Sequence, residues 1–132
     1  MADTVDVKVI RNGYYYVIHM QNRSDGTGET AVKKVDLNNI LTRPDGKIAT
    51  YCSVIRIEYS ISGFTQVRLD WQATPNNLIA TLAGPGLIDW SLEGGNVDPR
   101  TAGWTGDILL TTIGATPTAG YDITLWVRLK AP

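Results

Sequence analysis

The regular alternation of apolar and polar residues is the feature that most constrains how this chain can fold. It is clearest near the C-terminus, where every second residue is apolar: Tyr121, Ile123, Leu125, Val127 and Leu129. Side chains on a β-strand point alternately to opposite faces, so a period of two predicts a strand with one buried and one wet face. An amphipathic helix would show a period of 3.6 instead.

The same alternation recurs along most of the chain. Ile55, Ile57, Tyr59 and Ile61 are expected on one inward face, and Val67, Leu69 and Trp71 on another. The pattern predicts about eight strands, near residues 4–10, 14–22, 30–36, 49–61, 65–72, 77–82, 106–113 and 121–129.

Turn signals separate these runs. Asn12-Gly13 and Ser62-Gly63 are expected to form tight hairpins, because glycine and asparagine tolerate the positive φ that such turns need. Eight short strands without a long helical pattern favour an all-β chain, an antiparallel two-sheet β-sandwich of jelly-roll-like form. We expect residues 1–132 to form one domain.

Residues 29–41 are the ambiguous stretch. Val32 and Val35 fit a strand that ends near Val35 and is followed by a turn at 37–41. The spacing of Glu29, Val32 and Lys33 also permits a short amphipathic helix. We favour the strand.

Composition excludes several kinds of site. One cysteine and one histidine cannot supply an internal disulfide or a cysteine-rich zinc site, and 12 basic against 13 acidic residues leave no polycationic footprint for nucleic acid. The N-terminus shows neither a signal-peptide pattern nor a membrane-length apolar run. We therefore expect a protein made in a cytoplasm, with no cofactor, metal, membrane or nucleic acid.

Catalytic signals are equally sparse. His19 lies within a strand pattern and is interpreted as a half-buried structural residue, while Cys52 is interpreted as a small buried one. The segment from Asp25 to Glu29 resembles a calcium loop superficially but lacks the alternating carboxylate ligands. The sequence thus predicts a protein that is not an enzyme.

Residues 83–105 do not fit the strand pattern. The segment is rich in glycine and contains Trp90, Leu92 and Trp104, large side chains that tend to hold a loop in place. Its rings could cap an open end of the sandwich, or they could present a contact surface to a partner. Tryptophan and arginine dominate interface hot spots. The candidate protein-contact residues are Trp90, Asn96, Asp98, Arg100, Trp104 and Trp126.

Trp126 falls on the polar-looking face of the last strand. An exposed ring there could stack on a sugar or pack against a neighbouring subunit. Alternatively, the last strand is central and buried on both faces. A carbohydrate-binding module is therefore the alternative function.

Several motifs together carry a family resemblance that covers nearly the whole chain. They are Asn12-Gly-Tyr-Tyr-Tyr, Ser24-Asp-Gly-Thr-Gly-Glu29, Gly63-Phe-Thr-Gln-Val-Arg-Leu-Asp-Trp71, Asp98-Pro-Arg with Gly-Trp-Thr-Gly-Asp-Ile-Leu-Leu-Thr-Thr112, and Gly120-Tyr-Asp-Ile-Thr-Leu-Trp-Val-Arg-Leu-Lys130. In these motifs the chain resembles small virion structural proteins of tailed bacteriophages.

The resemblance implies a capsid decoration, or cement, protein on the outer capsid surface. The alternative is a carbohydrate-binding or host-surface adhesion module of a tail or fibre component. The resemblance also implies the major capsid protein as partner, and self-association as a homo-oligomer, expected to be a trimer. The first strand, residues 4–10, could pair with its own sheet or with the exposed edge of a neighbouring subunit.

Overall fold

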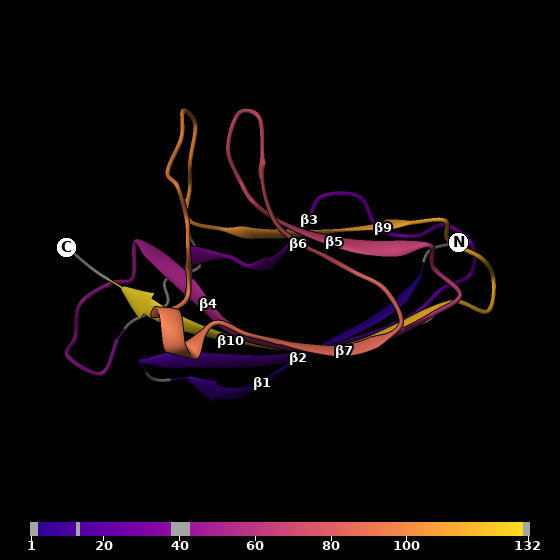
Figure 1. Cartoon of the computed structure of the whole chain (residues 1–132), viewed down its shortest axis with the longest axis horizontal. Helices are drawn as coiled ribbons and strands as arrows, with labels where there is room; N and C mark the ends of the chain where they lie inside the picture. The colour runs from indigo at the N-terminus through magenta and orange to yellow at the C-terminus, as the bar shows by residue number, and fades with distance from the viewer. Residues whose placement is uncertain (1–2, 13, 38–42, 131–132) are drawn as a thin grey trace.

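The computed structural model describes residues 3–12, 14–37 and 43–130, and these residues form two stacked antiparallel sheets (Figure 1). The all-β, two-sheet prediction is confirmed. The ten strands are β1 (Thr4–Asn12), β2 (Tyr15–Arg23), β3 (Val32–Val35), β4 (Tyr51–Ser62), β5 (Gln66–Trp71), β6 (Asn77–Leu82), β7 (Pro85–Asp89), β8 (Asn96–Val97), β9 (Ile108–Ile113) and β10 (Gly120–Lys130).

The order of the strands in the two sheets is that of a jelly roll. The large sheet runs β1-β2-β10-β4-β7, with β8 also paired to β4, and the small sheet runs β3-β9-β5-β6. The chain repeatedly crosses between the sheets, so that β2-β10-β4-β7 faces β3-β9-β5-β6 as two layers of four. The remaining long strand, β1, extends the large sheet beyond β2.

The core lies where the inner faces of the two sheets meet. All five predicted inward residues of β10 are buried, and so are Val67, Leu69 and Trp71 of β5. β10 is central, paired with β2 on one side and β4 on the other. The alternation therefore predicted the buried face of these strands correctly.

A bulge corrects the predicted face of β4. Trp126 pairs with Arg56 and Val127 pairs with Val54, which leaves Ile55 as an extra residue in β4. Because the bulge shifts the alternation by one position, Val54 and Ile57 both point into the core while Ile55 is only half-buried. The prediction that Ile55 shares the inward face of Ile57 was wrong.

Residues 83–105 are also more regular than predicted. They contain β7, the 3₁₀ turn Ser91–Glu93 and β8, and both strands pair with β4. Exposed residues and a leading proline hide β7 in the sequence, because proline is tolerated at the start of an edge strand. The space above Gly86 is filled by the Tyr59 ring, which a β-carbon at Gly86 would strike.

Two local predictions have different outcomes. β4 and β5 belong to different sheets, so Ser62-Gly63 is a crossover between layers and not the predicted hairpin. Val32–Val35 forms a strand paired with β9, which confirms the favoured interpretation of residues 29–35. Most of the turn predicted at 37–41 lies outside the described residues, as does Gly13 of the hairpin that joins β1 to β2.

Candidate functional site

Basic and aromatic side chains gather at one end of the sandwich. At this end, on the left of Figure 1, β4 begins and β10 ends. Tyr51 and Lys130 are cross-strand partners there. We call this the basic–aromatic end and define it by six residues: Arg43, Tyr51, Arg100, Trp104, Arg128 and Lys130.

Cations lie over ring faces throughout the basic–aromatic end. The Arg100 guanidinium lies 4.8 Å from the centre of the Tyr51 ring and 5.9 Å from that of Trp104. Lys130 Nζ is 5.9 Å from the Tyr51 ring centre. Such contacts orient the cations while leaving their donors able to meet an anionic group.

A shallow hollow of about 320 Å³ opens at the same end. Its lining combines three cationic side chains with one ring: Arg43, Tyr51, Gly94, Arg128, Leu129 and Lys130. One of these cations is partly neutralised, because Arg43 forms an ion pair with Asp45 at 3.1 Å. Because Arg128 and Lys130 also line the hollow, it is still suited to an acidic group presented by a partner.

The loop that carries Arg100 and Trp104 is braced by a second loop. Residues 72–77 and 101–107 project side by side from the sandwich (Figure 1). The Thr74 N–H donates to the Ala102 carbonyl at 2.9 Å, and Asn77 Nδ2 donates to Thr101 Oγ1 at 2.7 Å. We call these paired loops, together with residues 98–100 that lead into the second loop, the arm. Hydrogen bonds between its halves hold Trp104 in a fixed position relative to the sheets.

The predicted contact residues of the arm have different surroundings. Trp104 is 39% exposed, and Arg100 joins it to Tyr51. Asp98 is only 2% exposed, and its Oδ1 accepts the Arg100 N–H at 2.8 Å. That bond supports the positive φ of 54° at Arg100, so Asp98 shapes the loop from inside.

The other three predicted contact residues each pair with or hydrogen-bond to residues 54–56 of β4. The Trp90 N–H donates to the Ile55 carbonyl at 2.8 Å, Asn96 pairs with Val54, and Trp126 pairs with Arg56. The Trp90 ring packs against the core, which favours the capping role that the sequence left open for it. Trp126 is half-buried on the outer face, with the Arg56 guanidinium 5.1 Å from its ring centre.

His19 and Cys52 have the surroundings expected of structural residues. His19 is half-buried on the outer face of the large sheet and is paired with Asp122. Cys52 is fully buried, and burial together with the nearby carboxylates of Asp98 and Asp107 raises the pKa of its thiol. A buried thiol with a raised pKa is a poor nucleophile.

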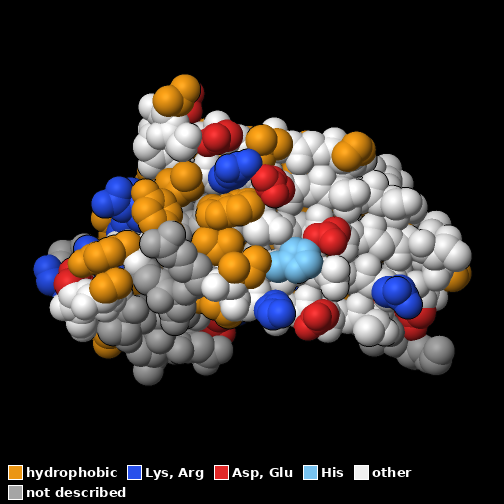
Figure 2. Space-filling model, turned by 90° about the horizontal axis from the view of Figure 1, so that it is seen from below, with side chains coloured by type: hydrophobic (Ala, Val, Ile, Leu, Met, Phe, Trp, Pro, Cys, Tyr) orange, Lys and Arg blue, Asp and Glu red, His pale blue; other side chains and the backbone are white. Residues whose placement is uncertain are grey.

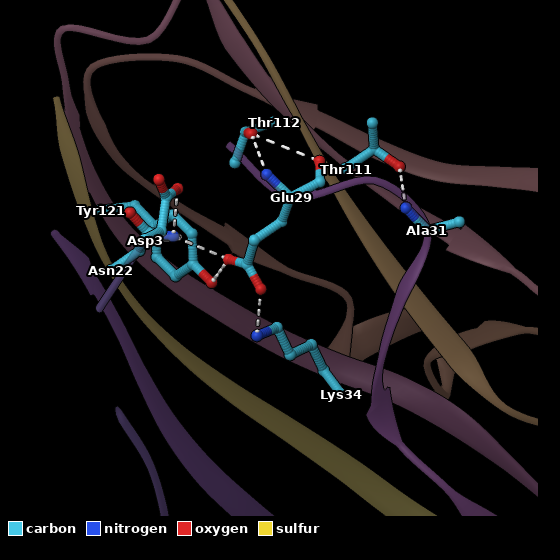
Figure 3. Close-up of polar contacts among 8 residues, drawn as sticks. All are labelled: Asp3, Asn22, Glu29, Ala31, Lys34, Thr111, Thr112 and Tyr121. Carbon is cyan, nitrogen blue, oxygen red and sulfur yellow. Dashed lines mark hydrogen bonds and ion pairs between the residues drawn. The ribbon is translucent and has the colours of Figure 1, made fainter. Parts of the chain in front are cut away.

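The loop that resembled a calcium site is held by protein donors (Figure 3). Glu29 is buried and accepts hydrogen bonds from Asn22 at 2.9 Å, Lys34 at 2.7 Å and the Tyr121 hydroxyl at 2.5 Å. Burial, and then the bond to Glu29, raises the pKa of Tyr121. Within the described part of the chain, no three histidine, cysteine or acidic residues cluster as metal ligands.

The outer face of the large sheet is the second candidate surface. Figure 2 views it from below, with hydrophobic side chains gathered over one half and a more polar other half. A hollow of about 510 Å³ lies along β4, β7 and β10, and its lining includes Glu58, Leu87, Asp122 and Thr124. Trp126 is on the same face, two residues along β10 from Thr124.

Tyr51, Arg43, Arg128 and Lys130 were missed as site residues by the sequence argument. They come from three separate segments, and in strands β4 and β10 they fit the ordinary alternation. The one available signal was that Tyr51 and Lys130 lie close to the start of the strand predicted at 49–61 and the end of the strand predicted at 121–129.

Comparisons of this chain with family models, curated proteins and solved structures found no significant match. None of the described helices is long and apolar enough to cross a membrane.

Proposed function

We propose that this chain is a structural protein of a tailed-phage virion, a capsid decoration protein that binds the outer surface of the major capsid protein. The family resemblance of its motifs supports the class, and the basic–aromatic end supports the mode of action. The observation that carries the proposal is the Tyr51–Arg100–Trp104 stack on a braced arm. Arginine and tryptophan held in place before binding are typical interface anchors.

The chemistry of the site supports one class of partner. Four cations and two partly open rings fit a protein surface that offers carboxylates beside an apolar pocket. A homo-oligomer, proposed to be a trimer, would present several copies of this end to a repeating capsid lattice. Several modest contacts then act together, which raises the avidity without a new contact in any one copy.

A binding assay with emptied, expanded capsids tests the proposal. Arg100→Ala and Trp104→Ala should each weaken binding by about 30-fold or more, as expected for hot-spot residues. Arg23→Ala is the matched control, because it removes an exposed cation from the opposite end of β2. The proposal fails if the native chain does not bind capsids, or if the control weakens binding as much as the arm variants do.

The mass of the purified chain tests the oligomer. A trimer has three times the chain mass of 14.4 kDa. Sedimentation equilibrium at several concentrations measures this mass directly. A species that remains at one chain mass at every concentration contradicts the trimer.

A carbohydrate-binding or adhesion role is the second candidate, because one hollow on the outer sheet face lies beside a tryptophan. Glu58, Asp122 and Thr124 could hydrogen-bond sugar hydroxyls there. Arg56 already occupies a position over the Trp126 ring, which reduces the surface left for stacking. Titration of the chain with host polysaccharide, followed by tryptophan fluorescence and repeated with Trp126→Ala, decides between the two functions.

A further inference from the structure

The first strand leaves an apolar stripe and a free edge uncovered. Val5, Val7 and Val9 pair with Asn22, Met20 and Ile18, whose side chains are buried on the inner side of the sheet. Opposite residues of an antiparallel pair point to the same face, so the valines also point inward. However, β1 lies beyond the four-on-four sandwich, and these valines remain 39%, 44% and 47% exposed.

The edge of β1 that faces away from β2 is also uncovered. β1 is the terminal strand of its sheet and has no strand partner except β2 among the described elements. Its start is held in place, because Asp3 accepts hydrogen bonds from Ser24 Oγ and the Gly28 N–H, both at 3.0 Å. A long, ordered strand edge has unpaired backbone N–H and C=O groups, and with an apolar face beside them it is prone to pair with another strand.

The sequence of β1 is complementary to itself. In an antiparallel pair of identical edges, the backbone groups that point outward alternate, so the two-fold axis must pass through a residue position. With the axis at Val7, Asp6 lies opposite Lys8 of the second copy and Val5 lies opposite Val9. Axes at Asp6 or Lys8 would instead set like charges directly opposite each other.

We propose that two copies of this chain pair through β1, antiparallel and centred on Val7, so that their large sheets become continuous. Both apolar stripes then lie on the same side of the joined sheet, between the two small sheets. Asp6 and Lys8 form two cross-strand ion pairs on the outer face. This two-fold contact rests on β1 alone and is independent of the proposed capsid function and of its three-fold association.

Disulfide trapping tests the register. Under mild oxidation, Val7→Cys should link two copies, because the Cα atoms of residues paired on the axis are about 4.5–5.5 Å apart. Val5→Cys is the matched control, since its two copies are separated by four residues of strand, about 13 Å. The double variant Val5→Cys/Val9→Cys should link again. Native Cys52 is buried and does not compete.

Charge reversal tests the pairing of Asp6 with Lys8 without forming a disulfide in β1. Asp6→Lys and Lys8→Asp should each weaken self-association about tenfold, whereas Asp6→Lys/Lys8→Asp should restore it. Sedimentation equilibrium measures the association, and circular dichroism checks that each variant folds. Equal linking by Val5→Cys and Val7→Cys overturns the register. An absence of both Val7→Cys linking and self-association up to about 1 mM overturns the contact and leaves the edge to another protein.

Discussion

The buried ion pair between Glu29 and Lys34 gives the sharpest test of how the fold is held together. The two side chains are 6% and 2% exposed, and Lys34 Nζ lies 2.7 Å from Glu29 Oε2. Lys34→Met removes the cation and leaves a buried carboxylate whose remaining described donors are Asn22 and Tyr121. Breaking a buried pair in this way costs about 3–5 kcal/mol.

The expected loss is large compared with the total. A domain of this size has a free energy of unfolding of about 5–15 kcal/mol, so Lys34→Met should lower the melting temperature on the order of 10–15 °C. Glu29→Gln/Lys34→Met removes both charges and should cost clearly less than Lys34→Met alone. Tyr121→Phe removes only one bond to the carboxylate, at a cost of about 1.5–3 kcal/mol.

Urea unfolding, followed by circular dichroism and tryptophan fluorescence, measures these free energies. Lys47→Met is the control, because Lys47 is an exposed loop residue and its loss should change stability by no more than about 0.5 kcal/mol. The reasoning is refuted if Lys34→Met costs less than about 1 kcal/mol, or if Glu29→Gln/Lys34→Met costs as much as the sum of Lys34→Met and Glu29→Gln measured singly.

Three further predictions follow from the core and its titratable groups. Leu125→Ala, in a central strand with a fully buried side chain, should lower the free energy of unfolding by about 2–5 kcal/mol in the same urea assay, and a change below 1 kcal/mol would contradict the packing described. Burial raises the pKa of Asp70 above its ordinary value of 3.8, although Arg68 opposes the shift. Because the folded state then favours the protonated carboxyl, the contribution of Asp70 to the free energy of unfolding falls as the pH rises through its pKa. The stability of Asp70→Asn relative to the native chain should therefore increase between pH 3 and pH 7. A relative stability that is no larger at pH 7 than at pH 3 would contradict the direction of the pKa shift. Cys52 should react with a thiol reagent only as fast as the chain unfolds, and rapid labelling in native buffer would show that the thiol is accessible.

The candidate site shows why a net charge is a weak guide to binding. The balance of 12 basic against 13 acidic residues, a formal charge of −1, indicated no polycationic surface. Folding nevertheless brings Arg43, Arg100, Arg128 and Lys130 to one end from distant parts of the chain. A sum over the sequence contains no information about which charges become neighbours, and local fields depend on those neighbours.

What the sequence by itself determined is the layer architecture and the inward faces of its most regular strands. The alternation in β10 and β5 suffices for this, because each strand must bury one face and the side-chain period is two. The composition of residues 83–105 also singled out Trp104 and Arg100, since large rings tend to hold a loop in place and tryptophan and arginine are enriched in interface hot spots.

Only the tertiary structure decided the bulge at Ile55, the strands hidden in 83–105 and the partners of the basic–aromatic end. Bulges and edge strands depend on which backbone lies alongside. An edge strand such as β7 buries too few side chains for its sequence to show an apolar alternation. Likewise, β1 alternates like any half-buried strand, and only its place beyond the small sheet leaves its valines uncovered. Periodicity specifies which face of a strand is apolar, whereas the packing of distant segments determines whether anything covers it.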